Sequence, residues 1–308
     1  MNKRPPSKMR KSTALLLLGL SFTSCANSAL QPAKTLQEWA EQAYYVSYDF
    51  KYYGIEKHRP DAIAGIEFIS TPLTDSDIKN LAQLKPEIYR LGIGQARITD
   101  KGIQYLSTIT SLRSLNIDSA PITDKSCPLL AKLNNLSTLS LEKTVISDTC
   151  ISELVKMKSL THLFINDTAI NGSGFKHFKS KIDEIYASRT HLNDAGLKFI
   201  GNMTQLRHLN ISGTRITDKG LLHLSGIKDL QHLDLRDTAI TSKGIINLLA
   251  KTRTLITLHL AKTNLTDEVI DSLSLATTLK DLTLYNTEIT AEAITKLRAA
   301  LPNTQIRF

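Results

Sequence analysis

The chain has 308 residues, of which 42% are hydrophobic and 22% are charged, and this composition excludes an intrinsically disordered or collagen-like protein. Lysine and arginine outnumber aspartate and glutamate by 38 to 29, and the resulting net charge of +9 raises the question of a nucleic-acid partner. With 6% aromatic residues and 14 glycines, the chain offers little for base stacking or for glycine-rich phosphate loops.

The segment 1–24 has the layout of a secretory signal peptide. Five basic residues precede position 12, and an apolar run follows at positions 14–22. That run is too short to span a membrane, for which roughly 20 apolar residues are needed. Removal of the segment 1–24 leaves 33 basic and 29 acidic residues, a net charge of +4, so the positive charge belongs mostly to the export signal. We therefore expect no nucleic-acid partner.

Residues 22–26 resemble the lipobox of bacterial lipoprotein signals, in which a small residue precedes the cysteine that becomes acylated. The resemblance implies that Cys25 is the first mature residue and the lipid anchor, and that Ala26 favours the outer membrane. The sequence departs from the pattern at Phe22, where the family usually has Leu. The alternative is cleavage at the small-x-small site over residues 26–28, which would release a soluble protein.

Residues 25–61 form a separate region that is rich in aromatic side chains. The aromatic residues are Trp39, Tyr44, Tyr45, Tyr48, Phe50, Tyr52 and Tyr53. We predict a capping helix from Thr35 to Ser47, because a stack of repeats needs its apolar end covered. The alternative is a second binding site in this region.

From residue 62 onward one motif recurs at nearly even spacing. It is a phrase of Ile or Leu followed by Thr-Asp, or a near variant, and it stands at Leu73, Ile98, Ile122, Ile146, Ile170, Leu192, Ile216, Ile240, Leu265 and Ile289. Before each phrase the residues repeat as LxxLxLxxTxI, whose alternation predicts a strand with one exposed face. After it, apolar residues three to four apart predict a short helix, as after Thr217 and Asp218, which supply an N-cap and a first-turn carboxylate.

This pattern resembles the leucine-rich-repeat family, and within it the cysteine-containing subtype of F-box-associated proteins, shortened to about 24 residues per unit. The resemblance implies an α/β solenoid over residues 62–308, a curved right-handed coil of about ten repeats with parallel inner strands and short outer helices. One family position, usually Asn or Cys, bonds backbone between coils, and we expect a threonine hydroxyl to do so here. The threonines are Thr144, Thr168, Thr190, Thr214, Thr238, Thr263 and Thr287.

Two cysteines lie in adjoining units. If Cys25 is lipidated or removed, Cys127 and Cys150 remain as an even pair in a compartment that permits disulfides. One repeat after Cys127 falls on Ile151, so Cys150 is displaced by one residue in the neighbouring coil. A bridge requires Cα atoms within about 7 Å of one another. We favour packed thiols, with a Cys127–Cys150 disulfide as the alternative.

The side chains that flank the LxL leucines face the open side of the predicted sheet, where such solenoids usually bind. Phe164 and Tyr186 are aromatic anchors there, and four of the eight histidines share this concave face. The candidate partner-binding residues are His162, Phe164, Glu184, Tyr186, His208, His232, Asp234, Arg236 and His259. Neighbouring imidazoles such as those of His208 and His232 could share a zinc ion with a carboxylate. Because polar residues are expected on an exposed sheet, we assign no metal.

Motifs of the common catalytic classes are missing. The sequence has no GxSxG, HExxH or Walker loop, and no Cys/His pair placed for nucleophilic attack. We predict a non-catalytic, monomeric scaffold without cofactors, exported from a bacterial cytoplasm to the outer membrane or periplasm, that binds a protein partner through its concave face. The runner-up is a secreted effector or adaptor resembling the F-box-associated repeat proteins. An enzyme with carboxylates grafted on the concave face is the third hypothesis.

Overall fold

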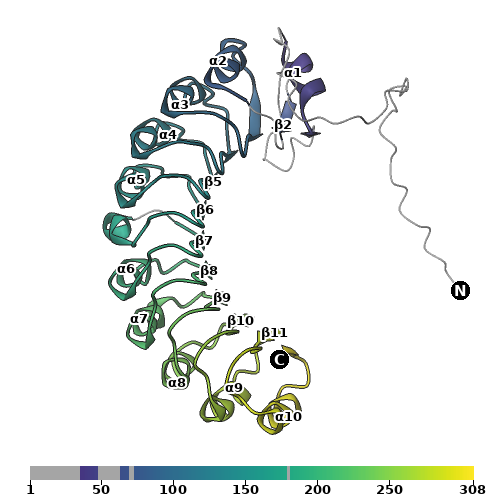
Figure 1. The fold of residues 1–308 in the computed structure, drawn as a ribbon, viewed down its shortest axis with the longest axis vertical. Coiled ribbons are helices and arrows are strands. Elements are labelled where there is room, and N and C mark those ends of the chain that lie inside the picture. The colour runs from purple at the N-terminus through teal and green to yellow at the C-terminus, as the bar shows by residue number, and fades with distance from the viewer. Residues whose placement is uncertain (1–34, 48–62, 69–72, 179–180) are drawn as a thin grey trace, which may run out of the picture. The chain divides into compact units, whose positions relative to one another are not determined.

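The computed structural model describes residues 35–47, 63–68, 73–178 and 181–308, and all of these belong to one compact unit, Pro32–Phe308. The predicted signal peptide, the candidate anchor Cys25 and much of the aromatic region lie outside the described residues. Within this unit, each coil contributes a strand to an inner sheet and a short helical segment to the outer side (Figure 1).

The strands of the described residues form a single sheet in chain order. They are β1 (Tyr45–Ser47), β2 (Ile63–Glu67), β3 (Ile88–Gly92), β4 (Ser114–Asn116), β5 (Thr138–Ser140), β6 (His162–Phe164), β7 (Glu184–Tyr186), β8 (His208–Asn210), β9 (His232–Asp234), β10 (Thr257–His259), β11 (Asp281–Thr283) and β12 (Gln305–Arg307). β1 is antiparallel to β2, and all later pairs are parallel. Each parallel step joins equivalent positions of two repeats, as where Leu209 faces Leu233.

In the coils after β2, the helical segments lie on the opposite side from the sheet (Figure 1). The α-helices are α1 (Leu36–Gln42), α2 (Asp75–Gln83), α3 (Asp100–Leu106), α4 (Cys127–Leu130), α5 (Asp148–Leu154), α6 (Asp194–Ile200), α7 (Asp218–Leu221), α8 (Ser242–Leu249), α9 (Ile270–Ser274) and α10 (Ala291–Ala300). The 3-10 segments are η2 (Asp124–Ser126), η3 (Ser173–His177), η4 (Leu222–Gly226) and η5 (Asp267–Val269). Leucine and isoleucine from both sides fill the space between, and Leu209 and Leu224 are fully buried. The predicted solenoid is confirmed.

The capping element differs from the prediction in its second half. The helix begins after Thr35, whose side chain and that of Glu38 form a reciprocal capping box, but it ends at Gln42 rather than Ser47. Residues Tyr45–Ser47 are instead β1, which pairs with the edge of β2. An edge strand satisfies the backbone groups that the first parallel strand would leave unpaired, and Tyr and Val favour that conformation.

The repeated threonines act within their own coils, so the expectation of a bond between coils was wrong. The hydroxyl of Thr214 donates to the carbonyl of Ile211, three residues earlier, and the other six threonines make the same bond. The residue before each threonine has a positive φ, for example 57° at Asp237, which turns the chain back onto that carbonyl. The short threonine side chain is therefore used to close the turn after each strand.

A different contact links neighbouring coils, and we call it the carboxylate clamp. The carboxylate of Asp218, at the start of α7, accepts hydrogen bonds from the N–H and hydroxyl of Thr241 in the next coil, at 2.8 and 2.6 Å. The equivalent pairs are Asp75–Thr99, Asp100–Thr123, Asp124–Ser147, Asp194–Thr217 and Asp267–Thr290. The sequence predicted Asp218 only as a favourable charge for its own helix, so this role between coils was missed.

The clamp explains a small residue that recurs in the first turn of each outer segment. A Cβ atom at Gly244 would lie 2.1 Å from Oδ1 of Asp218, so a side chain could be placed there only if the carboxylate or the backbone shifted. The equivalent residues beside other clamp carboxylates are Gly102, Ser126, Cys150, Gly220 and Ala293. Val269 occupies this position only where the preceding coil has Ser242, whose shorter side chain accepts from the N–H of Thr266 at 2.9 Å. The residue at this position is therefore small where the clamp side chain is aspartate and larger where it is the shorter serine.

The clamp is altered at the short coil, where the carboxylate of Asp148 accepts hydrogen bonds only from backbone N–H groups, those of Asn171, Gly172 and Gly174. Asn171 stands where the other coils have threonine or serine, and its side chain accepts from the N–H of Ser173 in its own coil. Gly172 takes the place of the clamp aspartate there, and it has no side chain that could accept hydrogen bonds from Asn193 of the next coil. The Asn193 side chain instead caps its own helix. Gly172 has a φ of 97°, a conformation that favours glycine.

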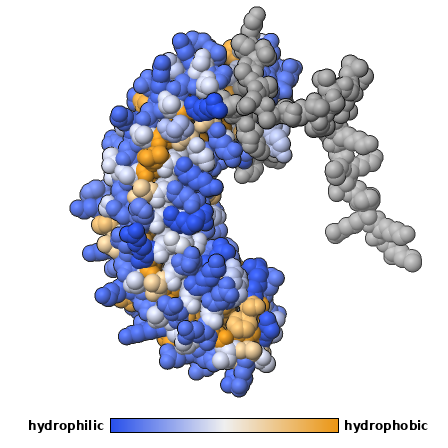
Figure 2. Space-filling model, in the orientation of Figure 1, coloured by the Kyte–Doolittle hydropathy of each residue, from blue (hydrophilic) through white to orange (hydrophobic). Residues whose placement is uncertain are grey.

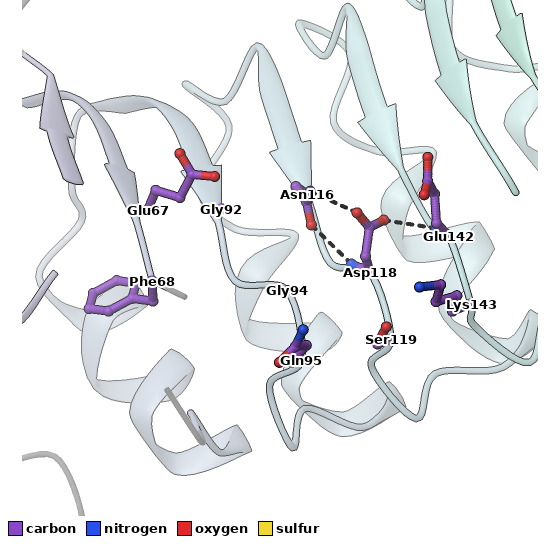
Figure 3. A pocket seen from close by; sticks show the side chains of 10 residues that line it. All are labelled: Glu67, Phe68, Gly92, Gly94, Gln95, Asn116, Asp118, Ser119, Glu142 and Lys143. Carbon is purple, nitrogen blue, oxygen red and sulfur yellow. Dashed lines mark hydrogen bonds between the residues drawn. The ribbon is translucent and has the colours of Figure 1, made fainter. Parts of the chain in front are cut away.

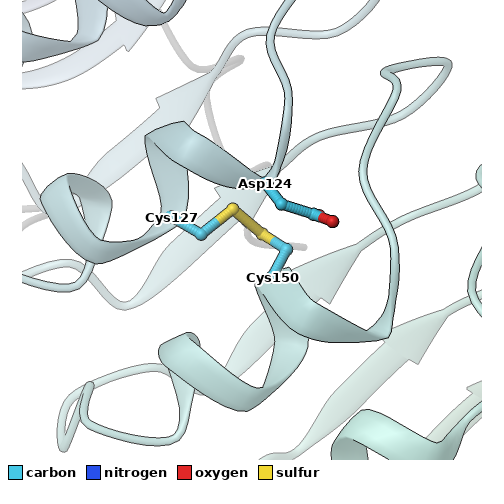
Figure 4. Close-up of side chains that lie close together, drawn as sticks. All are labelled: Asp124, Cys127 and Cys150. Atoms are coloured by element: carbon cyan, nitrogen blue, oxygen red, sulfur yellow. A yellow bond between two sulfur atoms is a disulfide. The ribbon is translucent and has the colours of Figure 1, made fainter.

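Cys127 and Cys150 form a disulfide between the neighbouring helices α4 and α5 (Figure 4). Their Cα atoms lie 5.2 Å apart, within the range that a bridge requires, and both side chains are fully buried. The favoured expectation of packed thiols is therefore wrong, and the alternative holds. The single-residue offset of Cys150 places it at the small-residue position beside the clamp of Asp124, which brings its sulfur toward Cys127.

Candidate functional site

The structure places the nine predicted partner-binding residues on one surface. They lie on five consecutive strands, β6 to β10, or in the turn after β9, and their side chains alternate with the buried leucines of those strands. Because the strands pair in register, residues from five coils become neighbours. Seven of them form two groups, one of stacked rings and one of charged side chains, and the other two, His162 and Glu184, lie 3.8 Å apart on β6 and β7.

Four flat side chains form a continuous stack that we call the ring ladder: Phe164, Tyr186, His208 and His232. The rings of Phe164 and Tyr186 are nearly parallel with centroids 4.5 Å apart, and Tyr186 lies 4.6 Å from His208. His208 and His232 follow at 5.1 Å. The ladder runs diagonally, because the first two rings come from the last residue of their strands and the imidazoles from the first. All four side chains are partly exposed.

Polar contacts hold the rings of the ladder in place. The hydroxyl of Tyr186 lies 3.3 Å from Nδ1 of His208, and Nδ1 of His232 lies 3.0 Å from the hydroxyl of Thr257. Burial, with a contribution from Glu184, raises the pKa of Tyr186 to about 12, so the phenol stays protonated. Burial also lowers the pKa of His208, which is therefore neutral at pH 7. The ladder thus presents uncharged Tyr186 and His208 rings near neutral pH.

The second group is a charged cluster centred on Asp234. Its carboxylate accepts two hydrogen bonds from Nε and one from Nη2 of Arg236, at 2.6 to 3.0 Å, and His259 Nδ1 lies 3.8 Å away. Burial opposes ionisation, but the contacts with His259 and Arg236 outweigh it and lower the pKa of Asp234 to about 2. Arg236 correspondingly has a raised pKa, mainly through this hydrogen bonding. The pair is a fixed, fully ionised element at the rim of the ladder.

Two members of the charged network were absent from the predicted set. Asp281 lies 3.9 Å from Nε2 of His259 and accepts a 2.6 Å hydrogen bond from Arg307. The sequence placed Asp281 on the exposed face but gave no reason to select it. Arg307 belongs to the closing strand, and only the parallel pairing of β11 with β12 brings it beside Asp281.

A pocket of about 250 Å³ opens at the other end of the sheet, beside the carboxyl ends of β2 to β5 (Figure 3). It is lined by Glu67, Phe68, Gly92, Gly94, Gln95, Asn116, Asp118, Ser119, Glu142 and Lys143. Its central carboxylate, Asp118, is saturated by hydrogen bonds from the Asn116 side chain, the Ser140 hydroxyl and the backbone N–H of Glu142. Burial, followed by the charge of Asp118, raises the pKa of Glu142. The sequence did not predict this pocket, and its polar atoms serve mainly to join coils.

The remaining surface gives no stronger candidate. The face shown in Figure 2 is mostly hydrophilic, and its hydrophobic side chains form small separate patches. Within the described ranges, no helix has the length and apolar character needed to cross a membrane. Two groups of potential metal-ligand atoms lie close together there, but Asp124 with Cys127 and Cys150 is not a metal site because the disulfide removes both thiolates. The other group is His162 with Asp183 and Glu184.

Comparison with known proteins supports the fold. The family model described as "Leucine Rich repeat" matches residues 202–225 and 228–249. No curated protein matches the chain. A leucine-rich-repeat protein of Leptospira interrogans is similar in structure with a TM-score of 0.57 and 18% identity, over 79% of this chain and 64% of that one. This chain therefore spans less than two thirds of the Leptospira protein.

Two further solved structures are similar to the chain. A TDR receptor has a TM-score of 0.50 at 12% identity, over 80% of this chain and 46% of the receptor. The match to an internalin from Listeria monocytogenes extends over 82% of this chain and 91% of the internalin, at 18% identity and with a TM-score of 0.41. At such identities the likeness concerns the fold alone, and the internalin match adds no argument to it.

Proposed function

We propose that this chain, whose fold is a leucine-rich-repeat solenoid, is a non-catalytic scaffold that binds a protein partner through the concave face of its sheet. The observation that carries the proposal is the ring ladder. Folding alone does not require rings on this face, since the core between sheet and helices is already filled by leucine and isoleucine. Partly exposed aromatic side chains held rigid by stacking are the usual centres of protein interfaces.

The surroundings of the ladder also suit protein recognition. The Asp234–Arg236 pair lies at one end of the ladder, and Glu184 lies beside Tyr186. A rigid aromatic centre with a charged rim is the arrangement that gives interfaces both affinity and selectivity. The rim is already internally paired, so the partner is expected to gain most of its binding energy from contact with the rings.

The same contacts support a non-catalytic role. The carboxylate most strongly ionised on this face, Asp234, is committed to Arg236 and is almost completely buried, so it has no free oxygen to act as a general base. His208 is oriented by Tyr186 and His232 by Thr257, and within the described part of the chain no carboxylate is hydrogen-bonded to either ring as the third member of a catalytic triad.

Replacement of both Phe164 and Tyr186 by alanine is expected to weaken partner binding about 30-fold, the loss typical of a central hot spot. The matched control is Leu275→Ala, which removes a large hydrophobic side chain of 67% exposure outside the sheet. Immobilised wild type and both variants are used to capture proteins from an extract of the source cells, and bound proteins are quantified by mass spectrometry.

A partner retained by wild type and Leu275→Ala but lost from the double variant identifies the ladder as the interface. Equal capture by all three proteins would reject the concave site. Circular dichroism of each protein shows whether the substitutions leave the solenoid folded.

We further propose that the protein is exported and held in a membrane by a lipid on Cys25. The basic, apolar and lipobox-like segments before residue 27 support this, and so does the buried disulfide, since stable disulfides form in oxidising compartments. Cells expressing the chain are expected to incorporate labelled palmitate into it, and processing is expected to stop with globomycin.

The control for the anchor is Cys25→Ser, which removes the acylated thiol and leaves the signal segments intact. If wild type takes up no palmitate and is processed in globomycin, the anchor proposal is wrong. Recovery of the unlabelled protein from the culture medium would then favour the secreted effector or adaptor.

A further inference from the structure

A row of metal-ligating side chains crosses the concave face next to the ring ladder. The first residues of β6, β7, β8 and β9 are His162, Glu184, His208 and His232, and each is paired in register with the next. Asp183 immediately precedes β7. Imidazole and carboxylate groups are therefore gathered from neighbouring coils at the distance between adjacent strands.

At one end of this row, three ligand atoms converge. One atom each from His162, Asp183 and Glu184 lies within 4.8 Å of the others. Nε2 of His162 and Oε1 of Glu184 are 3.8 Å apart, which is too long for a hydrogen bond. Two ligands of a tetrahedral zinc ion lie about 3.4 Å apart, given bonds of about 2.0–2.1 Å, so small rotations would bring these atoms to ligating distance.

The hydrogen bonds of His162 prepare its Nε2 for a metal. The hydroxyl of Thr161 donates its proton to the carbonyl of Ser137 at 3.2 Å, and the same oxygen lies 2.8 Å from Nδ1 of His162. The contact with Thr161 therefore holds the imidazole ring through Nδ1. Nε2 is left facing Oε1 of Glu184 at 3.8 Å, a gap that a cation bound by both groups would bridge. An imidazole held through its other nitrogen is also the usual support of a metal ligand.

The carboxylate of Asp183 is held in place by Arg207. Both of its oxygens accept hydrogen bonds of 2.5 Å from Arg207, which fixes the group in one orientation. An arginine pair leaves other lone pairs of a carboxylate available. Asp183 would thus be the third ligand, and a fourth position would remain open to water or to a side chain of another molecule.

We propose that His162, Asp183 and Glu184 form a binding site for a divalent transition-metal ion of the zinc class. The combination of one imidazole with two carboxylates favours such ions over magnesium and calcium, which prefer sites made only of oxygen. The site does not rest on the proposed partner binding, and each can fail without the other. It lies beside the ladder, since His162 shares β6 with Phe164.

The test is isothermal titration of the tag-free chain with zinc chloride, because a histidine tag would bind the ion itself. We expect one zinc ion per chain and no binding of magnesium. His162→Gln and Glu184→Gln are each expected to weaken binding at least tenfold. Thr161→Val, which leaves all three ligands in place, is expected to weaken it about tenfold through loss of the orienting bond. The matched control His191→Gln removes an exposed histidine from the turn after β7 and should bind zinc as wild type does.

Three results would overturn the site. They are the absence of saturable zinc binding by wild type, zinc binding by His162→Gln equal to wild type, and loss of binding in His208→Gln or His232→Gln only. Because a variant that does not fold would also lose zinc binding, the site is also tested by NMR on the unmodified chain. Zinc should change the ¹⁵N chemical shift of Nε2 of His162, and a change confined to His208 and His232 would also reject the assignment.

Discussion

Gly244→Val is expected to lower the free energy of unfolding by about 3 kcal/mol, because even the first atom of the new side chain overlaps Oδ1 of Asp218. Either the backbone of α8 shifts or the carboxylate of Asp218 moves away from Thr241. Movement of the carboxylate breaks both of its hydrogen bonds to Thr241. Two lost hydrogen bonds cost about 1–3 kcal/mol. Removing a helical glycine gains at most about 1 kcal/mol in helix propensity, which is too little to offset the overlap.

A natural pair of residues in this chain indicates which second substitution should restore the stability lost in Gly244→Val. Val269 is accommodated beside Ser242, so Asp218→Ser should relieve Gly244→Val by reproducing that pair one coil earlier. Asp218→Ser alone should lower the free energy of unfolding by about 1 kcal/mol. The double variant should have a free energy of unfolding at least about 1 kcal/mol higher than that of Gly244→Val. Urea denaturation followed by circular dichroism measures all four proteins. If the two substitutions are simply additive, the steric account of the recurring small residue is wrong.

Replacement of both Cys127 and Cys150 by alanine is expected to cost about 3 kcal/mol of stability. The bridge joins positions whose sequence separation is 23, and a constraint of that length on the unfolded chain has about this value. Urea denaturation of the double variant against wild type measures the loss, and Cys25→Ser is the control because it leaves the bridge untouched.

Thiol titration of the denatured chain checks the bridge itself. Reduction should expose two additional thiols in wild type. If the number of thiols is the same with and without reductant, the cysteines are unbridged, and the expected loss of stability disappears with the bridge.

The period of the sequence predicted the solenoid well, because a repeat of about 24 residues with strand spacing and then helix spacing has few other three-dimensional solutions. It also placed all nine candidate residues on one face, since alternation along a strand fixes which side chains point outward. What it could not supply is how those side chains meet. Tyr186 stacks on His208, which is diagonal to it, rather than only on its direct neighbour Phe164, and that choice depends on rotamers.

The failures at sequence level concern the contacts between coils. A threonine and an aspartate both recur with each repeat, and periodicity alone does not tell which of them bonds within its coil and which bonds to the next. Cys150 was difficult for a similar reason, because its offset from the repeat register acquires meaning only when helices α4 and α5 lie side by side. The helix predicted to Ser47 ended early because pairing with β2, a tertiary contact, outweighed local preference.

The carboxylate clamp also makes the coils interchangeable parts. Six clamps among the described residues join an aspartate of one coil to a threonine or serine of the next through the same two hydrogen bonds, as Asp194–Thr217 and Asp218–Thr241 do. A coil with aspartate at the start of its outer helix can therefore pack against any coil with threonine at the position before its helix. Deletion or duplication of one whole repeat would recreate the same two hydrogen bonds. The short coil that contains Asn171 and the junction of Ser242 with Thr266 are exceptions, so a change in repeat number at those places would not recreate the same hydrogen bonds.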